Sequence, residues 1–341
     1  SAKSVASGHF IDGRSLEIIE KGDNDIDNVR LATNEINEKE KVVYSSAFGM
    51  KKRKAIYREG LGATLINDDF DETKPYLIPK RTKIETNLPF PYGNLEPKDS
   101  LLPEVNYEKL NLAVANAFDQ KGEKIKRTRA LLVIYKDKII AEKYEEGFSK
   151  NTKFLGWSIT KSITATYFGI LQRQGKIDIN KPAPVIEWAN DSRSKITLHN
   201  LIQMNSGLEW NEDYGNISDV TKMLFLADDM AKEQLEKPAA FEPNKHWNYS
   251  SGTTNLLSGI LRRHFQNDQD YLDFWYSSLI DKIGMHSMLI EPDMAGNFVG
   301  SSYGWATARD WAKFGLLYLH EGKWNGEQIF DKSWAKYVAT P

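Results

Sequence analysis

The chain of 341 residues contains no cysteine, which excludes a fold held together by disulfide bonds. It also has no apolar run approaching 18 residues, so we expect no segment that spans a bilayer, and no signal peptide is visible. The formal net charge of -2 provides neither a basic surface for nucleic acid nor a polybasic membrane anchor. What remains is a chain with 40% apolar residues that is long enough to bury a large core.

Several motifs of enzyme chemistry are absent as well. The sequence has no G-x-S-x-G nucleophile elbow, no H-E-x-x-H zinc motif, no G-x-x-x-x-G-K-[ST] phosphate loop and no G-x-G-x-x-G dinucleotide fingerprint. The six histidines share no spacing typical of metal ligands. We therefore expect neither a metal nor a cofactor.

The sequence does contain a serine and a lysine three positions apart, Ser158 and Lys161, in the segment GWSITKS. Residues three apart on a helix lie on one face, so the amine of Lys161 can reach the hydroxyl of Ser158. Apolar residues then recur at three- and four-residue steps as far as Leu171, and Gly175 stands where a left-handed C-cap is expected. This pattern predicts a helix that begins at a serine activated without histidine.

Other interpretations of this motif have to be weighed. Two further S-x-x-K pairs begin at Ser192, in a polar turn, and at Ser333, which no long apolar run follows; we interpret both as chance matches. Ser158 also has a purely structural interpretation as the N-cap of its helix, with Lys161 in solvent. The helix dipole disfavours a lysine in the first turn, so this interpretation leaves Lys161 unexplained.

The surrounding segments support a catalytic setting. Residues 130–135 and 139–144 are typical of the two strands of a hairpin, with a polar turn between them. Farther on, Tyr249 and two serines end a loop, and an apolar helix is predicted over residues 255–261. A tyrosine at this point is a candidate for a second base.

Four blocks of this sequence resemble a known family. They are GWSITKS, ITLHNLIQMNSGL at residues 196–208, the Tyr249-Ser-Ser turn with NLLSGIL after it, and YGWATARDWAKFGLLYL at residues 303–319. Their order is that of serine β-lactamases of class C type, and the chain resembles that superfamily, with its penicillin-binding-protein, esterase and 6-aminohexanoate-dimer-hydrolase relatives, over roughly residues 100 to 341. The resemblance implies a mixed α/β (α+β) fold, with an antiparallel sheet flanked by helices plus a helical subdomain.

The resemblance also implies roles for three residues. Ser158 is expected to be the acylated nucleophile, Lys161 its proton acceptor or electrostatic partner, and Tyr249 the general base that passes protons to the leaving group. The backbone N–H of Ser158 is expected to form half of an oxyanion hole. Physical chemistry agrees with these roles, because burial lowers the pKa of a lysine and a neighbouring positive charge lowers that of a tyrosine.

Two departures from the family pattern affect the expected substrate. The second motif is usually Tyr-x-Asn, and here Ser251 takes the third place; we assign Ser251, Trp247 and Trp210 to substrate binding, with Tyr214 as a further cleft candidate. Aromatic residues beside turns also commonly serve in packing. The third family motif, Lys- or His-Thr/Ser-Gly, does not follow Tyr249, and we expect the C-terminal strands that carry it to be missing from this chain.

We expect one catalytic unit of two subdomains, with the N-terminal part as an extension of unassigned chemistry. The predicted parts are an extension over residues 1–100 with strand-like segments at 42–49 and 54–60, a sheet and helix part over 101–160 and 300–341, and a helical subdomain over 161–299. A further helix is predicted over 307–319. Relatives are often exported, so the resemblance implies a periplasmic or secreted location, with the cytoplasm left open.

The sequence thus favours a serine hydrolase that forms an acyl-enzyme on a small-molecule amide, ester or β-lactam. The alternative is a non-catalytic module on the same fold that binds a β-lactam or a cell-wall fragment without turnover. The oligomeric state is left open by the sequence.

Overall fold

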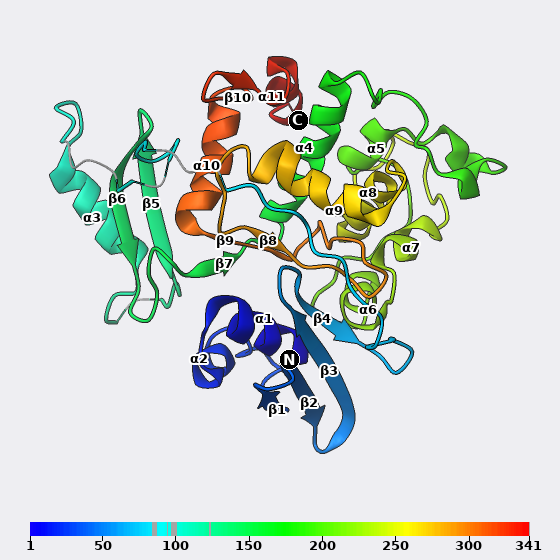
Figure 1. Cartoon of the computed structure of the whole chain (residues 1–341), viewed down its shortest axis with the longest axis horizontal. Helices are drawn as coiled ribbons and strands as arrows, with labels where there is room; N and C mark the ends of the chain where they lie inside the picture. Colours follow the sequence, from blue (N-terminus) through cyan, green and yellow to red (C-terminus); the bar gives the residue numbers. More distant parts are fainter. Residues whose placement is uncertain (84–86, 94, 97–100, 123, 341) are drawn as a thin grey trace. The chain divides into compact units, whose positions relative to one another are not determined.

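The computed structural model describes residues 1–83, 87–93, 95, 96, 101–122 and 124–340 (Figure 1). Contacts divide the chain into two compact units, each built from separate stretches of sequence. The first unit comprises Ser1–Lys80, Leu155–Phe274 and Leu289–Gly304; the second comprises Arg81–Phe154, Trp275–Met288 and Trp305–Pro341. The domain boundaries predicted from the sequence stay predictions, and the one near residue 100 falls at residues 97–100, which lie outside the described part of the chain.

The N-terminal part of the first unit is a complete antiparallel sheet. Its strands β1 (Ala32–Asn37), β2 (Val42–Ala47), β3 (Met50–Arg58) and β4 (Gly62–Ile66) pair in sequence order. Helix α1 (Ala2–Asp12) packs on this sheet, and α2 (Leu16–Lys21) follows it (Figure 1). The two strand-like segments expected here are confirmed as β2 and β3, whereas α1, α2, β1 and β4 were not predicted.

Small side chains explain how α1 approaches the sheet so closely. Ala2, Val5 and Ala6 lie at helical spacing and are at most 2% exposed. They share a core cluster with Val43, Ala55 and Ala63 of the sheet. The compactness of these side chains lets helix and strands meet with few voids, as dense protein packing requires.

The remainder of the first unit is mainly helical. Its helices are α4 (Ile159–Arg173), α5 (Leu198–Ile202), α6 (Asp219–Leu226), α7 (Met230–Leu235), α8 (Ser251–Arg263) and α9 (Asp268–Trp275), the last of which ends where the unit division falls. The predicted helix after Ser158 is confirmed as α4, and Gly175 has the expected left-handed conformation, with φ of +67°. The predicted helix at 255–261 is confirmed but begins earlier, at Ser251.

Helix α8 lies at the centre of this helical part. It contacts α4, α5, α6 and α7, and every residue from Ser251 to Leu261 is buried. A helix that is enclosed on all sides is a rigid support. The loop that carries Tyr249 is therefore anchored directly to a fixed element.

The second unit contains the predicted hairpin and the predicted last helix. Strands β5 (Ala130–Tyr135) and β6 (Lys138–Tyr144) pair antiparallel, and α10 (Ala308–Leu319) confirms the helix expected at 307–319. This unit also contains α3 (Tyr107–Ala117), a π-helical turn at Tyr276–Ile280, the short pair β10 (Lys323–Trp324) and β11 (Glu327–Gln328), and α11 (Lys332–Val338).

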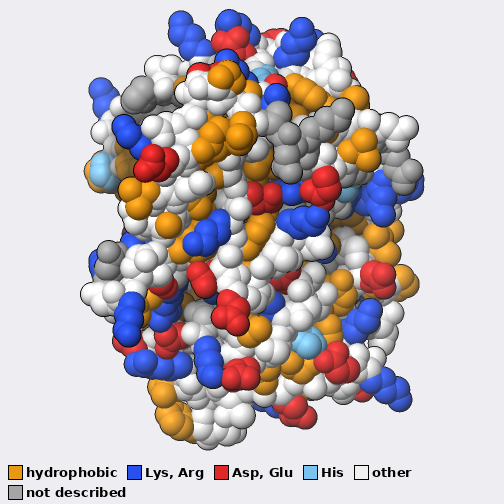
Figure 2. Space-filling model, turned by 90° about the vertical axis from the view of Figure 1, so that its left-hand side faces the viewer, with side chains coloured by type: hydrophobic (Ala, Val, Ile, Leu, Met, Phe, Trp, Pro, Cys, Tyr) orange, Lys and Arg blue, Asp and Glu red, His pale blue; other side chains and the backbone are white. Residues whose placement is uncertain are grey.

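A further sheet has the order β7-β9-β8, with bounds Lys153–Leu155, Gly304–Thr307 and Leu289–Ile290. The architecture is mixed α/β with antiparallel sheets, as expected from the sequence. On the face drawn in Figure 2, basic and acidic side chains are interspersed, in keeping with the small net charge. No helix in the described part of the chain has the length and apolar character needed to cross a bilayer.

Candidate active site

Ser158 occupies the N-cap position of α4, and its hydroxyl is free of any capping role. The residue is exposed and has φ of -65° and ψ of -13°, and its side chain makes no cap hydrogen bond. The hydroxyl instead accepts a hydrogen bond from Lys161, whose Nζ lies 3.1 Å away. The structure therefore contradicts the N-cap interpretation, in which the hydroxyl serves the helix and Lys161 points into solvent.

A sharp turn presents this serine. Trp157 has φ of +43°, a left-handed conformation that is uncommon for a large side chain and typical of functional turns. On its N-terminal side, the backbone N–H of Gly156 donates to the carbonyl of Gly304 at 2.7 Å. The chain is thus fixed immediately before the serine, and α4 holds it immediately after.

Lys161 lies on the first turn of α4 and is only 8% exposed. Burial lowers its pKa from 10.5 to about 8, and the nearby carboxylate of Glu212 opposes that shift. Its Nζ also donates to the backbone carbonyl of Ser301 at 2.9 Å. The amine is therefore half neutral near pH 8, far below the usual value for lysine, while two oxygen atoms fix its position.

Tyr249 comes to the same amine from a distant part of the sequence. The Nζ of Lys161 lies 5.0 Å from the centroid of the Tyr249 ring, within the range of a cation–π contact. The tyrosine is half-buried, and Ser250, the next residue, caps α8 by accepting from the N–H of Thr253 at 2.9 Å. The structure therefore brings together Ser158, Lys161 and Tyr249; their catalytic roles stay predictions.

Ser251 is fully buried in the first turn of α8 and is held by Glu212. Its backbone N–H donates to Glu212 Oε2 at 2.8 Å, and its hydroxyl donates to Glu212 Oε1. The hydroxyl of Tyr214 donates to the same carboxylate at 3.0 Å and lies 3.4 Å from the hydroxyl oxygen of Ser251. Burial raises the pKa of Tyr214 to about 12, so its phenol is a proton donor here.

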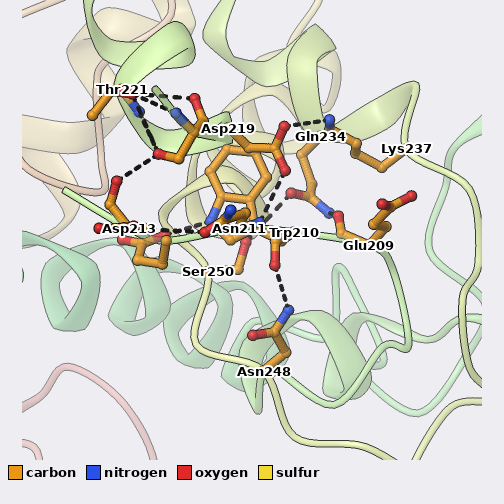
Figure 3. Close-up of polar contacts among 12 residues, drawn as sticks. Glu209, Trp210, Asn211, Asp213, Asp219, Thr221, Gln234, Lys237, Asn248 and Ser250 are labelled. Carbon is orange, nitrogen blue, oxygen red and sulfur yellow. Dashed lines mark hydrogen bonds and ion pairs between the residues drawn. The ribbon is translucent and has the colours of Figure 1, made fainter. Parts of the chain in front are cut away.

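The two tryptophans expected in the substrate cleft lie in different environments. Trp210 is 7% exposed, belongs to a core cluster and donates its indole N–H to Glu212. The side chain of Asn248 donates to its backbone carbonyl at 2.9 Å, which ties this loop to the segment before Tyr249 (Figure 3). Trp247 is 64% exposed, and its ring centroid lies 6.3 Å from that of Tyr249. Trp210 is thus a packing residue of the site, whereas Trp247 is open to a ligand.

Sequence reasoning missed two groups of this site, Glu212 and the carbonyl of Ser301. A signal for Glu212 was available, because Trp210, Glu212 and Tyr214 alternate, and alternate residues of an extended segment point to one side. No signal existed for Ser301, since its contribution is a main-chain atom.

The site is distinct from the large cavity of the same unit. That cavity has a volume of about 460 Å³ and is lined by residues of the β3–β4 region, of the loop at 67–77 and of α8 and α9, with none of Ser158, Lys161 and Tyr249 among them. No group of histidine, aspartate and glutamate side chains in the described residues is arranged to hold a metal ion.

Comparison with known proteins shows the family of this chain. Residues 114–340 match the model of the Beta-lactamase family, which is more than half of the chain. The chain belongs to the beta-lactamase family. The resemblance inferred from the four sequence blocks is therefore confirmed, and with it the mixed α/β fold class.

Individual relatives of this beta-lactamase family member are distant. A 6-aminohexanoate-dimer hydrolase from Paenarthrobacter ureafaciens is 25% identical over 224 residues, which are 62% of this chain and 57% of that protein. The chain therefore spans somewhat more than half the length of this relative.

Solved structures show the same fold. A Bacillus anthracis protein provisionally named as a 6-aminohexanoate-dimer hydrolase aligns with a TM-score of 0.54 at 23% identity, covering 63% of this chain and 60% of that one. An octameric penicillin-binding-protein homologue from Pyrococcus abyssi aligns with a TM-score of 0.51 at 17% identity, covering 69% of this chain and 60% of that one. At these identities the alignments show the fold alone.

Proposed function

We propose that this protein is a serine hydrolase that forms an acyl-enzyme at Ser158 on a small-molecule amide or ester. The observation that carries the proposal is the 3.1 Å hydrogen bond between the Ser158 hydroxyl and the buried amine of Lys161. A serine hydroxyl is a weak nucleophile that needs an adjacent base, and a lysine serves as that base when burial lowers its pKa. The 6-aminohexanoate-dimer hydrolase relative supports a hydrolytic reaction.

The first half of the reaction acylates the serine. The hydroxyl oxygen of Ser158 attacks the carbonyl carbon of the substrate while its proton passes to the neutral amine of Lys161. The oxyanion that forms receives a hydrogen bond from the backbone N–H of Ser158. The carbon–nitrogen or carbon–oxygen bond of the substrate then breaks, and the leaving group takes up a proton through Tyr249.

The second half regenerates the enzyme. Water attacks the acyl carbon while the same Lys161 and Tyr249 pair removes one of its protons. The ester bond to Ser158 then breaks, that proton passes to the oxygen of Ser158, and the acid is released. Trp247 is the candidate for substrate contact, because it is exposed next to Tyr249. Ser251, which the sequence assigned to substrate binding, is fully buried and donates its hydroxyl to Glu212, so we propose that it acts by holding Glu212 in place.

Covalent labelling tests this proposal directly. The protein is incubated with a fluorophosphonate probe and, in parallel, with a fluorescent penicillin, and the modified residue is mapped by mass spectrometry. We expect an adduct at Ser158 that is lost in Ser158→Ala and kept in Ser333→Ala, which changes the serine of another S-x-x-K pair. Failure of both probes to label the folded protein would reject the hydrolase and favour the non-catalytic binding module, whereas labelling without steady turnover of ester or amide substrates would favour a penicillin-binding receptor.

A further inference from the structure

The acceptor of Lys161, the carbonyl of Ser301, lies on a short turn at residues 299–303. This turn is tied to α8, because the backbone N–H of Ser301 donates to the side-chain oxygen of Asn255 at 3.1 Å. Ser301 itself is fully buried. The position of the turn therefore decides where the amine of Lys161 finds its second oxygen.

Glu291 closes this turn with its backbone. Its carbonyl accepts from the N–H of Val299 at 2.9 Å, and its N–H donates to the carbonyl of Tyr303 at 3.0 Å. The two ends of the turn are thus bonded to the same residue. The position of Glu291 therefore helps to set the position of the turn that contains Ser301.

The side chain of Glu291 is bonded to the N-terminal segment. Its carboxylate is 0% exposed and accepts from the amine of Lys3, from the hydroxyl of Ser7 at 2.8 Å and from the backbone N–H of Ala63 at 2.7 Å. Strand β4 comes so close that a Cβ on Gly62 would lie 2.7 Å from Glu291 Cγ. Lys3 and Ser7 belong to α1, so this helix and β4 together fix the carboxylate.

Lys3 also contacts Tyr303, the last residue of this turn. Its Nζ lies 4.2 Å from the centroid of the Tyr303 ring, and that ring lies 6.3 Å from the ring of Trp157, the residue before Ser158. Lys3 is 7% exposed, and burial lowers its pKa while Glu291 opposes that shift. A buried amine of this kind requires its carboxylate partner, so the two side chains hold one another in place.

We propose that the N-terminal segment of residues 1–66 positions the active-site lysine, with Lys3 and Ser7 acting through Glu291 on the turn that bonds Lys161. This segment precedes the region that matches the beta-lactamase family, which begins at residue 114. The extension is thereby a working part of the site. Its consequence for catalysis rests on the proposed function, whereas its effect on Lys161 does not.

A buried ion pair is a poor means of adding stability, since apolar residues of similar volume are often equally stabilising. Its directional bonds do specify one position for each partner. In this network that position is passed on by two backbone hydrogen bonds to the carbonyl that receives Lys161. Lys3, Ser7 and Glu291 are therefore positioning residues.

The variants for the test each weaken the contacts among Lys3, Ser7 and Glu291, to different degrees. Lys3→Met keeps most of the side-chain volume and removes the charge, Glu291→Gln removes the charge of its partner, and Ser7→Ala removes a single hydrogen bond to the carboxylate. Lys3→Arg keeps the positive charge and serves as the conservative variant. Lys54→Met is the matched control, because Lys54 lies in the same N-terminal sheet and pairs with Glu72.

The first readout is the titration of Lys161 itself. Acetic anhydride is reacted with the full-length protein over a range of pH, and the acetylation of each lysine is measured by mass spectrometry. Loss of the Ser301 acceptor disfavours the charged amine, so we expect the midpoint of Lys161 to fall in Lys3→Met and Glu291→Gln by about 0.4 to 1.5 pH units, the range that coupling through a packed network produces. Lys3→Arg and Lys54→Met should keep the midpoint of the unchanged protein.

The second readout is the rate at which the fluorophosphonate labels Ser158. At pH 10 the amine of Lys161 is neutral in every variant, so the rate there depends on how well the amine is placed. We expect Lys3→Met and Glu291→Gln to slow labelling at this pH by about twofold to thirtyfold, again the range of such coupling. An unchanged Lys161 midpoint and an unchanged labelling rate in these two variants, once shown to be folded by circular dichroism, would overturn the proposal. If Lys3→Met does not fold, Ser7→Ala carries the same test with a smaller expected change.

The two proposals fail in different ways. If Ser158 is not labelled in the unchanged protein, the hydrolase is rejected, and the titration of Lys161 still decides whether the N-terminal segment controls it. If Ser158 is labelled equally fast in every variant and Lys161 titrates identically, the hydrolase stands and the role of the N-terminal segment is rejected.

Discussion

Ser251 donates two hydrogen bonds to the carboxylate of Glu212, one from its backbone N–H and one from its hydroxyl. These bonds join the start of α8 to the loop before α6. The same carboxylate is the charge that raises the pKa of Lys161 against the effect of burial. Glu212 therefore connects the predicted substrate contact at Ser251 with the predicted base.

Glu212→Gln is expected to lower the pKa of Lys161 below 8. Burial then acts without the opposing negative charge, so the amine loses its proton at a lower pH. The rate of Ser158 labelling, measured from pH 5 to pH 10, should rise at a lower pH than in the unchanged protein. Its maximum should be about tenfold lower, since a hydrogen-bonded carboxylate that supports Ser251 is lost.

Glu209→Gln is the control for this change. Glu209 is exposed, and its backbone carbonyl is the atom that accepts from Gln234, so the profile should stay unchanged. A shift of the Glu212→Gln profile to higher pH would contradict the assigned electrostatic role.

The neutral form of Lys161 is the form that accepts a proton from Ser158. With the pKa of Lys161 lowered to about 8, the neutral fraction rises about tenfold with each unit of increasing pH up to that value, and it levels off at higher pH. Labelling of Ser158 should follow this curve, with a midpoint near pH 8. Lys161→Met should slow labelling by about 10² to 10⁴-fold, whereas Lys336→Met, in another S-x-x-K pair, should not. A rate that is flat from pH 6 to pH 10 would rule out this lysine as the base.

Tyr249→Phe separates two steps of the reaction. The variant keeps the ring beside Lys161 and removes only the hydroxyl, so turnover of an amide should fall by about 10² to 10⁴-fold because the leaving amine is no longer protonated. Labelling by a fluorophosphonate should fall much less, because fluoride leaves without a proton. Tyr44→Phe is the control in the N-terminal sheet. Equal losses in both assays would place Tyr249 in the attack step.

Gly252→Ala should destabilise the first turn of α8. A Cβ at this position would lie 2.4 Å from the side-chain oxygen of Gln234 and 2.6 Å from the ring of Trp210. Overpacking of this kind costs about 1 to 3 kcal/mol, and the melting temperature should fall accordingly. Gly315→Ala, in α10 with open space around it, should instead gain about 0.5 to 1 kcal/mol. Similar melting temperatures for the two variants would contradict the packing described for α8.

Local patterns in the sequence predicted the helix that carries Ser158 and Lys161, and also the hairpin of the second unit. The apolar spacing after Ser158 is a property of one helix, and the two apolar segments around the polar turn at 136–138 are a property of one hairpin, so both could be recognised without knowledge of the rest of the chain. The Ser158 and Lys161 pair is likewise local, since three residues of helix bring the two side chains to one face. Tyr249 lies much farther along the chain, and its place beside Lys161 was reached only through the family resemblance.

The contacts that cross the fold were beyond this reasoning. Glu212 collects donors from Trp210, Tyr214 and Ser251, and the last of these depends on how α8 meets a distant loop. Helix α1 was not predicted because Ala2, Val5 and Ala6 give only a weak apolar stripe, and their burial is decided by the sheet that they contact. The N-terminal segment was accordingly assigned no chemistry, although Lys3 and Ser7 bond directly to Glu291.

The acceptor for Lys161 at position 301 is a main-chain oxygen, and every amino acid supplies one. A saturation-mutagenesis scan would therefore rank substitutions at 301 by how well each side chain fits a fully buried space, and would report nothing about the hydrogen bond. Related proteins can likewise exchange this residue for others that fit the same space without losing the interaction. This part of the site therefore depends on the path of the backbone, and the residues that determine this path are the ones whose substitution would remove the interaction.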